Sequence, residues 1–208
     1  NNLSVMIVLG GNNMNFKTTH LFVLASASPR RKELFSLLNV PFEIVTSDVE
    51  ETSVTAQNVQ QYVTEVALLK TRDVAKKCPN KTVIGADTIV VYNDMLLHKP
   101  KSREEAINHL QTLSNDTHDV LTAVAILAPN GQEFTFVEET KVIFKDVPQQ
   151  LIEAYVDSAD PFDKAGGYGI QTDGVFFVDR IEGDYNNVVG LPIASLVENL
   201  LSLRYISI

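Results

Sequence analysis

The chain reads Leu21-Phe22-Val23-Leu24-Ala25-Ser26-Ala27-Ser28-Pro29-Arg30-Arg31-Lys32-Glu33-Leu34 where its first strand and first helix are expected. The apolar residues 21–24 predict a strand, Ser28 is a preferred helix N-cap residue, and Pro29 suits the first helical position. The turn between them presents unpaired backbone N–H groups, two hydroxyl groups and two guanidinium groups at one helix N-terminus. This strand, turn and helix predict the first unit of an alternating α/β fold.

The same turn is suited to bind a phosphate chain. A helix N-terminus is electropositive and its free N–H groups point outward, while arginine binds phosphate oxygens in a planar, bidentate geometry. Three successive cations, Arg30, Arg31 and Lys32, are slightly unfavourable there unless an anion is present. A capped helix whose basic first turn is merely solvated would have the same sequence, and the residues alone leave both interpretations open.

The overall composition narrows the class of protein. With 208 residues the chain can form one large domain or two small lobes, and 45% hydrophobic with 21% charged residues is ordinary for a globular protein. A net charge of −9 argues against a nucleic-acid binder, although it does not exclude a nucleotide ligand. The single cysteine, Cys78, excludes an internal disulfide and fits a reducing compartment. No apolar stretch reaches membrane-spanning length, so we expect a cytoplasmic protein that binds neither nucleic acid nor membrane.

Strand and helix patterns alternate along most of the chain. We interpret residues 1–19 as an N-terminal extension or a remnant of cloning, and residues 20–208 as a single α/β domain. Strands are predicted near residues 21–25, 42–46, 82–91, 120–127, 134–144 and 175–181, and helices near 29–38 and 56–77 and after Ser102, Pro148 and Pro192. A hairpin turn at residues 92–95 and the alternating strand 134–144 indicate a mixed sheet rather than a purely parallel one.

Asp87 is the sharpest single candidate for chemistry. It lies within an otherwise apolar strand, residues 83–91, where an ionised carboxylate must be paired, hydrogen-bonded or metal-bound. Gly85 permits another part of the backbone to approach closely. The same residue could instead lie at the end of a strand and cap the next turn.

Further charged residues are candidates for ligand binding. Lys70 falls on the apolar stripe of the helix at 56–77, where it either faces a partner charge or extends its head group to solvent. Residues 48–51, Asp-Val-Glu-Glu, offer carboxylates that suit Mg²⁺ or Mn²⁺ beside phosphates, although an acidic run is often a solvated loop.

A glycine-rich stretch at residues 163–171 has the composition of a ligand loop. Its glycines allow the backbone to approach a ligand, Lys164 can meet a phosphate, and Gln171 can pair with a base edge because its amide both donates and accepts. Taken alone, such a loop is a weak signal.

Taken together, these segments resemble the Maf family of nucleoside triphosphate pyrophosphatases. The matching segments, in the family's order, are residues 26–31, 48–51, 85–88, 99–100, 117–120, 163–171 and 187–192. The resemblance covers the chain from about residue 21 to residue 203. It implies an elongated, two-lobed, mixed-sheet α/β fold similar to inosine triphosphate pyrophosphatases, with the active-site cleft between the lobes. It also implies a homodimer and the hydrolysis of a nucleoside triphosphate to the monophosphate and pyrophosphate, with Mg²⁺ or Mn²⁺ as cofactor.

The resemblance assigns roles to individual residues. Asp87 matches the family's proton acceptor, and Asp87 with Glu51 is expected to hold the metal. The residues expected to bind the substrate phosphates are Ser26, Ser28, Arg31, Lys70, Lys99 and Lys164. Those expected to influence substrate choice are Arg30, Thr88 and Gln171.

The sequence Gly-Tyr-Gly-Ile-Gln at residues 167–171 is similar to that of the subfamily acting on dTTP and UTP. Thr172 stands where the family usually has glycine, and Gly167 where it has alanine, which affects the expected base preference and loop rigidity. CTP and modified pyrimidine nucleotides fit the same interpretation. Two different functions also fit these residues: a 7-methyl-GTP pyrophosphatase, and a non-catalytic nucleotide sensor that regulates cell division through a protein partner.

Overall fold

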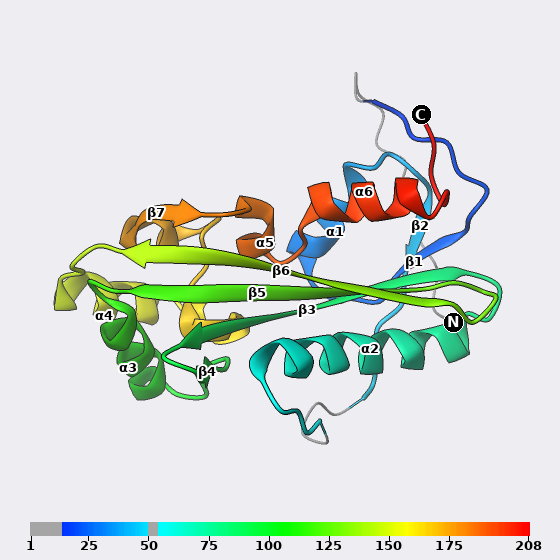
Figure 1. The fold of residues 1–208 in the computed structure, drawn as a ribbon. Coiled ribbons are helices and arrows are strands. Elements are labelled where there is room, and N and C mark those ends of the chain that lie inside the picture. The colour runs from blue at the N-terminus through cyan, green and yellow to red at the C-terminus, as the bar shows by residue number, and fades with distance from the viewer. Residues whose placement is uncertain (1–13, 50–53) are drawn as a thin grey trace. The chain divides into compact units, whose positions relative to one another are not determined.

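The computed structural model describes residues 14–49 and 54–208, which form a mixed α/β fold (Figure 1). Within these residues lies one seven-stranded sheet with the strand order β2-β1-β3-β5-β6-β7, and β4 pairs with β3. The strands are β1 (Phe22–Leu24), β2 (Phe42–Ile44), β3 (Thr82–Tyr92), β4 (Met95–Leu97), β5 (Thr117–Leu127), β6 (Glu133–Phe144) and β7 (Val178–Glu182). Strand β1 is parallel to both β2 and β3, whereas β4 and β7 are antiparallel to β3 and β6. The predicted mixed sheet is therefore confirmed.

The helices alternate with these strands along the chain. The α-helices are α1 (Pro29–Ser36), α2 (Val59–Lys77), α3 (Arg103–Leu113), α4 (Gln149–Asp157), α5 (Tyr185–Val189) and α6 (Ile193–Ser202). Three short 3₁₀ helices, η2 (Asp160–Asp163), η3 (Ala165–Gly167) and η4 (Asp173–Phe177), lie between α4 and β7. Within the described residues no helix is long and apolar enough to cross a membrane.

The chain divides into two compact units. The first comprises the described residues up to Asp87 together with Ala123–Val137 and Gly190–Ile208, and the second comprises Thr88–Thr122 and Glu138–Val189. Strands β3, β5 and β6 each contribute residues to both units. The boundary within β3 falls directly after Asp87, so Asp87 and Thr88 belong to different units.

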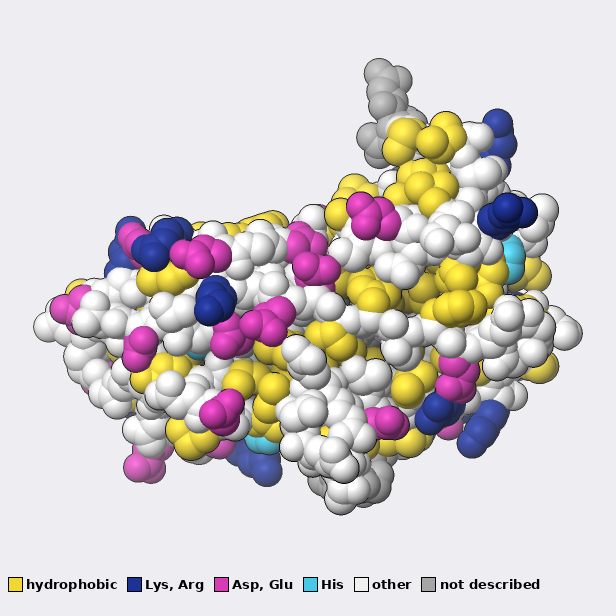
Figure 2. All heavy atoms as spheres, in the orientation of Figure 1, with side chains coloured by type: hydrophobic (Ala, Val, Ile, Leu, Met, Phe, Trp, Pro, Cys, Tyr) yellow, Lys and Arg dark blue, Asp and Glu magenta, His cyan; other side chains and the backbone are white. Residues whose placement is uncertain are grey.

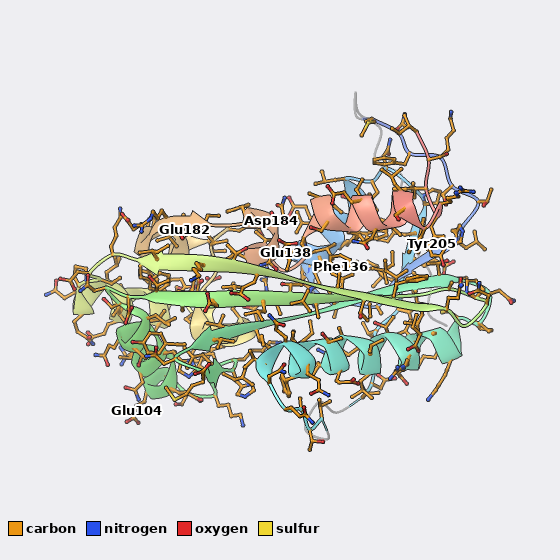
Figure 3. The ribbon with its side chains drawn as sticks, viewed as in Figure 1. Glu104, Phe136, Glu138, Glu182, Asp184 and Tyr205 are labelled. Atoms are coloured by element: carbon orange, nitrogen blue, oxygen red, sulfur yellow. The ribbon has the colours of Figure 1, made fainter. Side chains whose placement is uncertain are left out.

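The first unit is built on the parallel strands β1, β2 and β3. Helices α2 and α6 lie on opposite sides of the sheet (Figure 1). A cluster of buried apolar side chains joins α2 to the strands: Val23, Ala25, Val74, Cys78 and Val83. Near the C-terminus, Tyr205 (labelled in Figure 3) stacks on the ring of His20 with centroids 4.2 Å apart, and Lys17 forms an antiparallel bridge with Ser207. The described part of the N-terminal segment therefore packs on the C-terminal residues.

The second unit has a core rich in aromatic side chains. The rings of His118, Phe144 and Tyr168 pack edge to face with centroids 4.8–5.4 Å apart, and Phe177 is fully buried beside them.

On the face drawn in Figure 2, acidic side chains are distributed among polar and apolar ones, in accord with the net charge of −9.

Most element boundaries follow local sequence signals. Ser28 is the N-cap of α1 and Pro29 its first residue, as predicted. Helix α2 begins at Val59 rather than near Ala56, because the side chain of Asn58 accepts the Gln61 N–H at 2.8 Å and caps the helix there.

Two parts of the secondary-structure prediction are wrong. The predicted strand at 175–181 forms only from Val178, because residues 173–177 form η4, in which Phe177 is buried while Val175 and Phe176 are 45% and 59% exposed. A strand would place Val175 and Phe177 on the same face, so the apolar run here belongs to a 3₁₀ turn. Helix α5 is absent from the prediction, since its five residues carry no clear apolar periodicity.

Candidate active site

The turn between β1 and α1 is closed by its two serines. The Ser26 hydroxyl oxygen accepts the Ser28 N–H at 3.2 Å, and the Ser28 hydroxyl oxygen accepts the Arg31 N–H at 3.4 Å. A hydroxyl group that accepts in this way keeps its own proton for donation to an anion. Both serines thus fix the backbone of the turn and retain the chemistry expected of phosphate ligands.

Arg31 is oriented by the other end of the chain. Its Nε donates to the carbonyl oxygen of Gly190 at 2.7 Å. Gly190 has φ of +126°, a conformation that side-chain-bearing residues rarely adopt. The backbone shape at Gly190 therefore helps to set the direction of the Arg31 guanidinium group, which together with Arg30 is half-buried on the first turn of α1.

Asp87 and Lys70 form an ion pair within the first unit. Lys70 Nζ lies 2.8 Å from Asp87 Oδ1, and the two side chains are 20% and 11% exposed. Asp87 lies in the middle of β3 and not at its end, so it is not a capping residue. The ammonium group of Lys70 reaches this carboxylate, which decides against a lysine that merely extends to solvent.

Gly85 allows α2 to approach β3 closely enough for this pair. A Cβ atom at Gly85 would lie 2.1 Å from Thr71 Oγ1 and 3.2 Å from Thr71 Cβ. Thr71 is fully buried, and its hydroxyl donates to the Ala67 carbonyl at 2.6 Å. The structure does show a close approach at Gly85, but it is made by the side chain of Thr71, the residue that follows Lys70, and not by backbone as predicted.

The pairing of β1 with β3 places the turn that follows β1 beside the strand that carries Gly85 and Asp87. Leu24 pairs with Ile84, and the Ala25 N–H donates to the Ile84 carbonyl at 2.8 Å. The turn that follows β1 therefore begins beside Gly85 and the residues after it. Carboxyl ends of parallel strands are where α/β folds bind ligands.

In the second unit, Thr88 is held by a hydroxyl network. Its Oγ1 lies 2.8 Å from Thr122 Oγ1, which also bonds to the Asn187 carbonyl at 3.0 Å. The Asn187 amide donates to the Val120 carbonyl and to Thr140 Oγ1, at 3.0 Å and 2.9 Å. Thr140 Oγ1 in turn bonds to the backbone of Asp184, which Figure 3 labels. Thr88 is thus fixed by strands β3 and β5 and by α5.

Lys99 and Lys164 lie on two adjacent segments of the same unit. Lys99 is exposed, and the neighbouring His98 carbonyl accepts the Gly166 N–H at 3.3 Å. Lys164 is 8% exposed, and its ammonium group donates to the carbonyl and carboxylate of Asp160 and to Asp163. Gln171 is exposed on the same loop.

The loop is anchored to the unit's core through Tyr168. Its hydroxyl lies 2.7 Å from Nε2 of His118, which is 2% exposed. Burial lowers the pKa of His118 to about 4, so the imidazole is neutral at neutral pH. Burial also raises the pKa of Tyr168. The tyrosine therefore serves as a neutral anchor.

The comparisons with known proteins bear on this arrangement. A sequence model of a family described as Maf-like protein matches residues 21–203. The chain belongs to this Maf-like family. It is 49% identical over 183 residues to the dTTP/UTP pyrophosphatase of Geobacillus sp. (strain WCH70), covering 88% of this chain and 98% of the relative. It is 51% identical over 178 residues to the dTTP/UTP pyrophosphatase of Bacillus cereus (strain ATCC 14579), covering 86% and 93%.

Among solved structures, a HAM1 protein from Coxiella burnetii matches with a TM-score of 0.53 at 15% identity, over 89% of this chain and 100% of the other. This likeness concerns the fold alone. It supports the mixed α/β fold expected from the resemblance to the Maf family. The expected cleft between lobes depends on how the two units are placed and stays a prediction.

The residues expected to form a Maf-like site are divided between the two units. Ser26, Ser28, Arg30, Arg31, Lys70 and Asp87 belong to the first, and Thr88, Lys99, Lys164 and Gln171 to the second. Glu51 lies outside the described residues. Sequence reasoning missed the roles of Gly190, Asp160, Tyr155 and Thr172. Only the four-residue spacing of Asp160 and Lys164 gave a local signal for any of them.

The donor chemistry at Asp87 suits the expected metal. Mg²⁺ prefers oxygen ligands and is commonly held by one or two carboxylates together with substrate phosphates. Asp87 supplies one such carboxylate from β3, three residues beyond Ile84, which pairs with the last residue of β1. Over the described residues no group of three or more acidic, histidine or cysteine side chains is placed to hold a metal alone. This arrangement fits a cation that binds together with a triphosphate.

Proposed function

We propose that this Maf-like protein hydrolyses dTTP and UTP to the monophosphate and pyrophosphate. The observation that carries the proposal is the Lys70–Asp87 ion pair on β3, the strand that pairs with β1 where β1 leads into the α1 turn. About half of all residues are identical to those of proteins named dTTP/UTP pyrophosphatase, over most of both chains.

In the proposed reaction, Asp87 accepts a proton from the attacking water. The water oxygen bonds to the α-phosphorus while the bond from that phosphorus to the bridging oxygen breaks. Pyrophosphate leaves with the electron pair of that bond. The Lys70 ammonium group holds the Asp87 carboxylate in place. It is proposed also to bind a phosphate oxygen of the substrate.

The remaining cations stabilise the charge that grows on the leaving pyrophosphate. Arg31, aimed by Gly190, binds phosphate oxygens together with the hydroxyls of Ser26 and Ser28. Lys99 is proposed to supply a further cation, whereas Lys164, whose ammonium group donates to Asp160 and Asp163, holds the loop that carries Gln171. Asp87 and Glu51 would hold a divalent cation, Mg²⁺ or Mn²⁺, which when bound neutralises phosphate charge.

Substrate choice is proposed to depend on Gln171, Arg30 and Thr88, the residues to which the resemblance to the Maf family assigns it. The Gln171 amide can pair with the adjacent carbonyl and N–H groups of a uracil or thymine edge. A flipped amide would suit cytosine, so CTP and modified pyrimidine nucleotides are the nearest competing substrates.

A pyrophosphate-release screen tests the proposal. Purified protein with Mg²⁺ or Mn²⁺ is offered dTTP, UTP, CTP, ATP, GTP and 7-methyl-GTP, with EDTA as control. Metal-dependent release from dTTP and UTP supports the proposal, whereas preference for 7-methyl-GTP keeps the chemistry and contradicts the role of Gln171. Nucleotide binding without turnover on any substrate would instead indicate a sensor.

Asp87→Asn provides the test of the catalytic assignment. It keeps the shape of the side chain and removes its basicity, so we expect loss of about 100-fold or more in kcat. Asp94→Asn is the matched control, because Asp94 lies in the exposed turn between β3 and β4 with φ of +62°, which asparagine tolerates. Turnover by Asp87→Asn equal to that of Asp94→Asn would overturn the assignment.

A further inference from the structure

Asp160 is the centre of a hydrogen-bond network in the loop that carries Gln171. Its Oδ2 accepts the hydroxyl of Tyr155 at 2.5 Å and the hydroxyl of Thr172 at 2.6 Å. Its Oδ1 accepts Lys164 Nζ at 2.9 Å. One carboxylate thus connects helix α4, the start of the loop and its end.

Gln171 lies between two fixed points of this network. On one side, the Gly169 N–H donates to the Tyr155 hydroxyl oxygen at 3.0 Å. On the other side, Thr172 follows Gln171 directly, and its N–H donates to the Gly169 carbonyl at 3.2 Å. The exposed Gln171 side chain is therefore presented by a backbone segment that is held at both ends.

The loop is also closed by tight packing. A Cβ atom at Gly169 would lie 2.5 Å from Lys164 Cε and 2.7 Å from Thr172 Oγ1. A Cβ atom at Gly174 would lie 2.6 Å from the Gly169 carbonyl oxygen. The segment has no room for a side chain at either glycine, so it is folded on itself and is not an open ligand loop.

The charges within the loop balance locally. The three protons of the Lys164 ammonium group have three acceptors: the Asp160 carbonyl at 2.7 Å, Asp160 Oδ1 at 2.9 Å and Asp163 Oδ1 at 2.6 Å. Burial alone would raise the pKa of Asp160, but hydrogen bonds from Thr172, Tyr155 and Lys164 outweigh it and lower that pKa. The carboxylate is ionised at neutral pH and accepts all of these bonds.

We propose that Asp160 and Thr172 are positioning residues that hold Gln171 in place for the pyrimidine base. The inference rests on the function proposed above and concerns how the same site selects its base. An unrestrained loop would lose conformational freedom on binding, and would let the glutamine amide adapt to either uracil or cytosine. The tether reduces that loss and fixes the backbone position from which the Gln171 amide extends.

The test compares Thr172→Val with Thr172→Ser. Valine keeps the branched shape and removes the hydroxyl, whereas serine keeps the hydroxyl. We expect Thr172→Val to raise KM for dTTP and UTP about fivefold, as the loss of one hydrogen bond of average strength predicts, with kcat within about twofold. The ratio of kcat/KM for dTTP over CTP falls by a similar factor, and Thr172→Ser restores both values.

Asp173→Asn is the matched control, because Asp173 is the exposed next residue and makes no side-chain bond to Asp160. Hydrogen exchange supplies a readout that does not depend on turnover. The Gly169 and Thr172 amides are expected to exchange faster in Thr172→Val than in wild type, and at the wild-type rate in Asp173→Asn. Unchanged exchange overturns the tether, and faster exchange with unchanged KM and base ratio overturns its positioning role.

If the proposed pyrophosphatase activity is itself wrong, the measurements give a different set of results. If wild type releases pyrophosphate from no nucleotide, the activity is wrong, and the tether is then judged by exchange and by the Kd for a non-hydrolysable dTTP analogue. A Kd for Thr172→Val about fivefold above those of wild type and Thr172→Ser supports the positioning role. Equal Kd values for all three proteins, or no binding by any, overturn it.

Discussion

Lys70 Nζ lies 2.8 Å from Asp87 Oδ1, and the pair spans helix α2 and strand β3. Each charge lies in surroundings that would be unfavourable for it alone: Asp87 is flanked by buried apolar residues of β3, and Lys70 by the buried face of α2. The pair therefore combines two functions, since it satisfies a largely buried carboxylate and places a cation beside the proposed base.

Replacing Lys70 with methionine separates these contributions. Lys70→Met leaves the Asp87 carboxylate without its cation, so we expect the free energy of unfolding to fall by about 2 kcal/mol. Loss of a cation from the phosphate site should lower kcat/KM about 100-fold. Urea unfolding and pyrophosphate release measure the two effects.

The double variant Lys70→Met with Asp87→Asn is the control. A neutral amide no longer needs the cation, so we expect the double variant to recover much of the lost stability and none of the activity. Equal stability of the single and double variants would show that the unpaired Asp87 carboxylate does not destabilise the fold.

Gly85→Ala tests the close approach that makes the pair possible. The new methyl group would lie 2.1 Å from Thr71 Oγ1 in a buried interface, so α2 or Thr71 must shift. We expect a loss of about 2 kcal/mol of unfolding free energy and a fall in kcat of about tenfold, because displacement of α2 moves Lys70. Thermal or urea unfolding and turnover check both.

Adding Thr71→Ala to Gly85→Ala removes Oγ1, the atom at 2.1 Å, and leaves a contact of 3.2 Å between the Cβ atoms of residues 85 and 71. We expect the pair of changes to be less destabilising than the sum of the single changes. Strict additivity would mean that Gly85 and Thr71 do not interact, contrary to the structure.

The α1 turn and the need of Asp87 for a partner could be predicted from the sequence because both depend on local features. Ser28 and Pro29 define the start of α1 by their own backbone preferences, and an aspartate within an apolar strand demands a partner wherever the fold places it. Gly85 is predicted to permit a close approach, but its partner, Thr71, depends on how α2 packs and has no sequence signal.

Most of the missed contributions depend on contacts between separate elements of the fold. Arg31 and Gly190 are 159 positions apart, and nothing near either residue indicates that a carbonyl meets a guanidinium group. Tyr155 and Thr172 meet at Asp160 only because the loop folds back on α4. The prediction places Phe177 in a strand because three consecutive apolar residues fit a strand as well as a 3₁₀ turn.

Gly190→Ala tests the proposed alignment of Arg31. With φ of +126° at this position, a side chain would strain the backbone by about 1–3 kcal/mol and rotate the carbonyl that accepts Arg31 Nε. We expect a comparable loss of stability and a rise in KM for dTTP of about tenfold.

Gly131→Ala is the matched control for strain. Gly131 also has positive φ, at +83°, but lies in the turn between β5 and β6, where an added Cβ meets nothing within 4 Å. It should lose stability without any change in KM. If both alanine variants raise KM equally, the effect of Gly190 comes from general destabilisation and not from Arg31.

The buried His118 predicts a specific loss of stability in acid. Its pKa is lowered by burial to about 4 in the folded protein, against 6.5 as an ordinary value, and its buried Nδ1 has no hydrogen-bond partner among the described residues. Between these two pH values the unfolded chain takes up a proton that the folded chain does not. The contribution is therefore fully present above pH 6.5 and is lost as pH falls towards 4, by about 3 kcal/mol at most.

Urea unfolding of wild type and His118→Gln at pH 7 and pH 4.5 isolates this contribution. Glutamine retains a polar atom for the Tyr168 hydroxyl and does not titrate, while carboxylates with lowered pKa values, such as Asp116 and Asp160, titrate in both proteins. We expect the free energy of unfolding to fall more steeply with acid in wild type than in His118→Gln. Parallel pH profiles would mean that His118 titrates in the folded protein as it does in the unfolded chain, so that burial does not disfavour its imidazolium form.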